Sequence, residues 1–123
     1  MKRIKFRAKG IKDGKYIYSN SIKFENIDLP QLYLYDKNSG HFIRCIPETL
    51  QQFTGMYDYD GVEIYEGDII RNISFPELKF EVDWYRGCWI TKSTYAEIVE
   101  DEFEILYEAL RNFKFNVILT EEK

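Results

Sequence analysis

The sequence predicts a mostly β fold, α+β at most, with barrel-like or sandwich-like antiparallel sheets and one helix near the C-terminus. Short stretches in which apolar and polar residues alternate with a period of two are typical of half-buried strands. Turn signals rich in Gly and Asp separate these stretches. Helical spacing of apolar residues occurs only beyond Ser93.

Length and composition bound the possible classes. The chain has 123 residues, of which 45% are hydrophobic and 17% aromatic, so we expect one folded domain over residues 1–123. No apolar run is long enough to span a membrane and no signal peptide is recognisable, which predicts a cytoplasmic protein without a membrane partner. Cys45 and Cys88 are expected to be reduced and mostly buried.

The predicted strands follow one another as hairpins. Residues 3–9 alternate basic and apolar side chains, turn at Asp13-Gly14 and return over residues 15–18. A second hairpin has a longer polar turn between residues 32–35 and 41–46. Further strands are expected at residues 21–24, within 47–55, and at 62–65, 69–72, 79–84, 88–91 and 115–119.

One helix is expected from Thr94 to about Arg111. Thr94 and Glu97 have the spacing of a capping box. Apolar side chains then recur at helical spacing at Val99, Phe103, Leu106, Leu110 and Phe113. The acidic residues of this segment are expected to face solvent or, alternatively, the basic strand of another protomer.

The formal net charge of −4 conceals a division along the chain. Residues 1–23 carry eight Lys and Arg against a single Asp, a net charge of +7, while residues 24–123 carry a net charge of −11. Such a division indicates a partner of opposite charge, which can be a protein or a nucleic acid.

The first predicted strand holds the candidate contact residues, which are Arg3, Lys5, Arg7 and Lys9. Four cations on one face, roughly 6.6 Å apart, match a phosphate backbone, and the nearby Tyr16 and Tyr18 can stack on bases. The same cations would also protect an edge strand from aggregation, or pair with an acidic strand such as that of Glu81 and Asp83. The acidic balance of the chain favours these structural roles over nucleic-acid binding.

The acidic residues 58–68 suggest catalysis or calcium binding. An EF-hand frame set by Gly61 would put Met56 and Gly67 where that loop needs carboxylates, so the calcium site is excluded. We interpret the segment as two turns around a short strand. His41 is the only His, and the chain has neither a phosphate-binding nor a dinucleotide-binding glycine motif. We therefore expect no enzyme, no cofactor and no metal.

Residues 50–70 contain an aromatic-Thr-Gly sequence, an Asp-x-x-Gly turn and the sequence Ile-Tyr-Glu-Gly-Asp-Ile. Together with MKRIKFRA at residues 1–8 and the hairpin of Trp84 and Trp89, this order resembles the YopX family of phage and prophage proteins. Residues 115–121 lack the Gly and the Pro with which that family usually ends. The resemblance implies a mostly β fold, a phage or prophage origin and a location in the bacterial host cell, and it implies no activity.

These observations predict a non-enzymatic phage accessory protein that acts through protein contacts. Its expected partners are a second copy of itself, in a homo-oligomer, or an unidentified host or phage protein. The alternative is a small nucleic-acid-binding β domain that uses the basic N-terminal strand.

Overall fold

The computed structural model describes residues 4–26, 29–94 and 103–118. The chain divides into two compact units, Met1–Phe53 and Thr54–Lys123. The boundary falls inside a strand, β6 (Gln51–Tyr57), whose first residues belong to unit 1 and whose remainder belongs to unit 2. The single domain predicted over residues 1–123 stays a prediction.

Unit 1 is built from hairpins. A three-stranded antiparallel sheet has the order β3-β4-β5, and β1 pairs antiparallel with β2 on one side and with the start of β6 on the other. Backbone hydrogen bonds from Ile46 N–H to the Lys9 carbonyl (2.8 Å) and from Ile11 N–H to the Arg44 carbonyl (3.0 Å) join β5 to β1. The elements are β1 (Phe6–Lys9), β2 (Tyr16–Ser19), β3 (Ile22–Asn26), β4 (Pro30–Asp36), β5 (His41–Cys45) and a 3₁₀ turn, η1 (Pro47–Thr49).

The core of unit 1 forms where one face of β4 meets β1. Ala8, Leu32, Leu34 and Cys45 are fully buried there. Because side chains alternate along a strand, burial of Leu32 and Leu34 turns the intervening tyrosines of β4 to the other face of its sheet.

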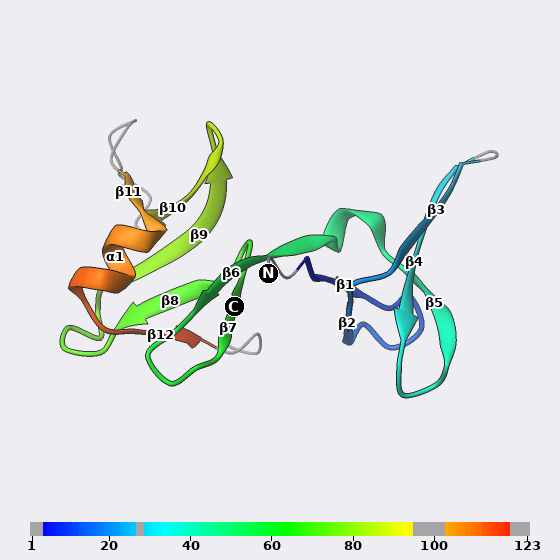
Figure 1. Cartoon of the computed structure of the whole chain (residues 1–123), viewed down its shortest axis with the longest axis horizontal. Coiled ribbons are helices and arrows are strands. Elements are labelled where there is room, and N and C mark those ends of the chain that lie inside the picture. Colours follow the sequence, from blue (N-terminus) through cyan, green and yellow to red (C-terminus); the bar gives the residue numbers. More distant parts are fainter. Residues whose placement is uncertain (1–3, 27–28, 95–102, 119–123) are drawn as a thin grey trace. The chain divides into compact units, whose positions relative to one another are not determined.

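Unit 2 contains a five-stranded antiparallel sheet of order β11-β10-β9-β8-β12. The core of unit 2 contains Ile64, Ile70, Val82, Leu106 and Phe115. The helix α1 packs beside β10 (Figure 1). Leu106 and Ala109 lie one helical turn apart on the buried side of α1. The elements are β7 (Glu63–Tyr65), β8 (Ile69–Asn72), β9 (Lys79–Tyr85), β10 (Cys88–Ser93), β11 (Phe103–Ile105), α1 (Leu106–Asn112) and β12 (Phe115–Ile118).

The predicted fold class is confirmed. Among the described residues, strands make up 56% and helical residues 10%, the antiparallel sheets include a half-barrel, and the one α-helix lies near the C-terminus. No helix of the described ranges is long and apolar enough to cross a membrane.

The predicted start of the helix is wrong. The described helix begins at Leu106, and residues 103–105 form β11, which pairs with β10 through Ile90 and Ile105. The Thr94 hydroxyl donates to the Lys79 carbonyl at 3.4 Å, so it serves the β9–β10 hairpin. The predicted capping partner Glu97 and the acidic residues near it lie outside the described residues.

Candidate functional site

Asp58 organises the turn at the centre of residues 50–70. Its Oδ1 accepts the backbone N–H groups of Asp60 and Val62, both at 2.9 Å, and its Oδ2 accepts that of Val117 at 3.0 Å. Asp58 is only 7% exposed. Gly61 has a φ of 86°, which a side chain would strain, and its N–H closes the turn on the Asp58 carbonyl. The carboxylate therefore fixes the turn and ties it to β12.

Asp68 has the same kind of role in the next turn. Its Oδ2 accepts the backbone N–H of Tyr65 at 2.8 Å, and its side chain is buried. Gly67, with a φ of 85°, donates its N–H to the Val82 carbonyl at 2.7 Å. Both aspartates of the turns thus hold backbone groups. The interpretation of residues 58–68 as two turns around a short strand is confirmed, since β7 lies between them.

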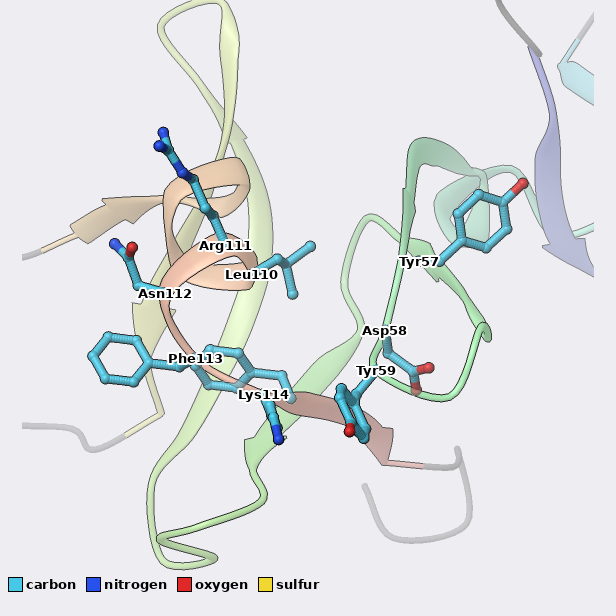
Figure 2. A pocket seen from close by; sticks show the side chains of 9 residues that line it. Tyr57, Asp58, Tyr59, Leu110, Arg111, Asn112, Phe113 and Lys114 are labelled. Carbon is cyan, nitrogen blue, oxygen red and sulfur yellow. The ribbon is translucent and has the colours of Figure 1, made fainter.

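A pocket of about 320 Å³ opens beside the Asp58 turn (Figure 2). Leu110 points from α1 across the opening toward the side of Tyr57, while Asn112 and Phe113 point outward. Tyr57 and Tyr59 are about half exposed. The Lys114 ammonium lies 4.9 Å from the centre of the Tyr59 ring, which is a cation–π contact.

This pocket was not predicted from the sequence. Its two sides are brought together by the hydrogen bond from Val117 to Asp58, between positions 59 residues apart. The sequence signal that existed was local: two tyrosines flank the turn aspartate, at Tyr57 and Tyr59. Nothing in the periodicity of the C-terminal segment indicates that Leu110 and Lys114 face them.

The basic strand predicted over residues 3–9 is observed as β1 from Phe6 to Lys9, so that Lys5 precedes the strand. The described cations of this segment contact aromatic rings. Arg7 is 4% exposed, its Nε donates to Gln51 Oε1 at 2.7 Å, and its guanidinium lies 4.5 Å from the centre of the Tyr16 ring. The Lys9 ammonium lies 5.4 Å from the same ring, and that of Lys5 lies 5.9 Å from the Phe53 ring. Arg3 lies outside the described residues.

Two structural roles were expected for these cations: protection of an edge strand, and pairing with an acidic strand. β1 lies between β2 and β6, so its interpretation as an edge strand is wrong. Asp83, considered as an acidic partner, binds Lys92 of the neighbouring strand at 2.9 Å. That hydrogen bond and the charge of Asp83 raise the pKa of Lys92. Whether β1 contacts a partner stays a prediction.

A hollow of about 470 Å³ lies beside the β1–β2 hairpin. Tyr16 and Tyr18 line it together with Lys15 and Lys37, and Tyr18 is half exposed. The acidic side chains nearby are engaged in their own turns: Asp13 accepts the Lys15 N–H, and Asp36 accepts the Asn38 N–H. The lining of this hollow thus includes two tyrosines, two lysines and these two aspartates.

The described residues contain no group of three or more His, Cys, Asp and Glu side chains that could hold a metal ion. Cys45 is buried in the core of unit 1, and this burial raises the pKa of its thiol. Cys88 is partly exposed and also free. A buried neutral thiol is a packing residue, because the thiolate is the nucleophile and the metal ligand.

Fold and site together define a small, mostly β protein in which the aspartates of the two central turns support the backbone and tyrosines are displayed beside a pocket. The family model described as YopX protein matches residues 5–118, and the chain belongs to the YopX family. No curated protein matches the chain. The family resemblance seen in the sequence is therefore confirmed.

Proposed function

We propose that this protein is a non-enzymatic accessory protein of a phage or prophage that acts in the bacterial cytoplasm through protein contacts, among them contacts with a second copy of itself. The observation that carries the proposal is the pocket beside the Asp58 turn, flanked by Tyr57 and Tyr59. Tyr is enriched among the residues that dominate binding energy at protein interfaces.

The turn that carries these tyrosines is preorganised by hydrogen bonds within the protein. Three backbone N–H groups bind the Asp58 carboxylate, so ordering the loop costs little on binding. Leu110 gives the pocket an apolar side, and Lys114 gives it a cation at the rim. This composition suits a partner side chain that combines an apolar body with an acidic group.

The charges of the two units support association between copies. Residues 1–53 hold ten Lys and Arg against five Asp and Glu, a net charge of +5. Residues 54–123 hold seven against sixteen, a net charge of −9. Unlike surfaces on one chain favour a heterologous contact between copies, which closes into a ring or continues as a filament.

Sedimentation velocity of the full-length wild type and three full-length variants tests the pocket. Tyr57→Ser and Tyr59→Ser should each weaken self-association by about tenfold, the usual effect of losing an interface tyrosine. The matched control is Tyr107→Ser, which removes a half-exposed tyrosine of α1 that does not line the pocket. Equal weakening by all three changes, or a wild-type protein that stays monomeric, would contradict the proposal.

Nucleic-acid binding by the β1–β2 hairpin is the second candidate. The observation that favours it is the hollow lined by Tyr16, Tyr18, Lys15 and Lys37. Arg7 and Lys9 add two further cations, which lie 4.5 Å and 5.4 Å from the centre of the Tyr16 ring. Lys15→Gln with Lys37→Gln should lower both the affinity for an oligonucleotide and its salt dependence. Unchanged binding by this double variant would remove the candidate.

A further inference from the structure

The outer face of the β3-β4-β5 sheet carries aromatic side chains where polar ones are usual. Leu32 and Leu34 of β4 point into the core, so Tyr33 and Tyr35 lie on the outer face. In the register of the sheet, Tyr35 is opposite Phe42 of β5. We call Tyr33, Tyr35 and Phe42 the aromatic face.

The three rings and one lysine form a connected group. The rings of Tyr35 and Phe42 lie 5.5 Å apart in an edge-to-face arrangement. The ammonium of Lys23 lies 5.4 Å from the Tyr33 ring and 5.8 Å from the Phe42 ring. Cross-strand aromatic pairs stabilise a sheet by themselves. Here, however, Phe42 stays 46% exposed, so a large part of its ring remains available to a ligand.

Cations accompany the aromatic face on both neighbouring strands. Lys23 of β3 and Arg44 of β5 both stand opposite Tyr33 in the register. Glu25 is the acidic neighbour, 3.0 Å from the Lys23 ammonium, and both side chains of this pair are well exposed. An exposed ion pair contributes little, so a phosphate can compete for the lysine. The unit that bears this face has a net charge of +5 in a chain of net charge −4.

From these contacts we infer that the aromatic face binds single-stranded nucleic acid, with bases stacked on Tyr33, Tyr35 and Phe42 and the backbone phosphates on Lys23 and Arg44. Stacking requires unpaired bases whose faces are accessible, which a duplex does not offer. Three rings on adjacent strands accommodate about two or three bases. The inference goes beyond the functions proposed above, because it uses none of the residues of the pocket or of the β1–β2 hairpin.

Fluorescence anisotropy with a labelled oligothymidylate of about fifteen nucleotides, at low salt, tests the inference on the full-length protein. Phe42→Ala should weaken binding by about fivefold to a hundredfold, the range found for losing one stacking ring. Lys23→Gln, which keeps most of the side-chain stem, should weaken binding and reduce the salt slope by about one. A duplex of the same length should bind more weakly than the single strand.

Phe24→Ala is the matched control, because Phe24 of β3 is a more exposed ring, at 61%, on the opposite face of the same sheet. It should leave the affinity unchanged. Absence of binding by the wild-type protein, equal affinity for the duplex, or equal weakening by Phe24→Ala would overturn the inference. Binding that is unaffected by both Phe42→Ala and Lys23→Gln would also overturn the inference. This holds even if Lys15→Gln with Lys37→Gln abolishes that binding, since the site would then be the β1–β2 hairpin. A change in self-association alone would assign the aromatic face to a protein contact instead.

Discussion

The two units place their charged groups differently. In unit 1, the cations of β1 and β3 lie over aromatic rings, as Arg7 does over Tyr16 and Lys23 over Tyr33. In unit 2, the carboxylates of Asp58 and Asp68 are buried and hold backbone N–H groups. The Lys23 side chain is half exposed and accessible to a partner, whereas the 4% exposed Arg7 and the buried carboxylates serve the fold. A count of charges along the sequence does not distinguish these two uses.

The largest expected effects concern the cores. Leu34→Ala in unit 1 and Leu106→Ala in unit 2 each remove a fully buried leucine and should lower the free energy of unfolding by about 2–5 kcal/mol. Urea denaturation followed by circular dichroism measures both. A loss below about 1 kcal/mol for either variant would show that its unit lacks the close packing described.

Asp58→Ala tests whether the turn carboxylate is structural. The change leaves the backbone N–H groups of Asp60, Val62 and Val117 without their acceptor, and we expect a loss of about 3 kcal/mol. The control Asp60→Ala alters an exposed carboxylate of the same turn and should cost less than about 0.5 kcal/mol. Equal urea midpoints for the two variants would contradict the account of this turn.

The reactivities of the two cysteines allow a comparison between the interior of unit 1, where Cys45 is buried, and the partly exposed position of Cys88 in unit 2. Burial raises the pKa of Cys45, so its folded form resists ionisation, and reaction must await local opening. We expect Cys88 to react with a thiol reagent about a hundredfold faster than Cys45. Stopped-flow labelling of Cys45→Ala and Cys88→Ala, each retaining one thiol, separates the rates. Similar rates would show that Cys45 is accessible.

The exposed ion pairs should matter least. Lys92→Met in unit 2 and Lys23→Met in unit 1 should each change stability by no more than about 1 kcal/mol. The pKa of Lys92 is raised in the folded state, so its contribution is present below the ordinary lysine pKa and is lost as the pH rises through the raised value.

Urea midpoints of the wild type and Lys92→Met at about pH 8 and pH 11 measure that dependence. The difference between the two proteins should shrink at the higher pH. A difference that grows with pH would contradict the assignment of the Lys92–Asp83 pair.

Local sequence signals predicted most of the fold. The hairpin turns at Asp13-Gly14 and Arg86-Gly87 were predicted from pairs of adjacent residues. The strands on either side of each turn pair as expected. The start of the helix was missed because β11 is fixed by its ladder to β10, and residues 103–105 carry apolar spacing compatible with either structure. Pairing between separated segments overrides a local pattern in this case.

The candidate sites depended more on distant contacts. Arg7 and Lys9 both lie over Tyr16, as alternation predicts, but the burial of Arg7 comes from Tyr16 and from Gln51, which is 44 residues away. The aromatic face of β3-β4-β5 follows from which side of β4 faces the core. That choice is set by packing against β1 and not by the sequence of β4 alone.

The central claim is that this protein acts through contacts between macromolecules, in the first place between copies of itself. Light scattering coupled to gel filtration, over a range of concentrations up to roughly tens of micromolar, tests it most directly. We predict a mass above the 14.8 kDa of one chain that rises with concentration and falls in about 1 M salt. A constant mass of 14.8 kDa at every concentration and salt would contradict the claim.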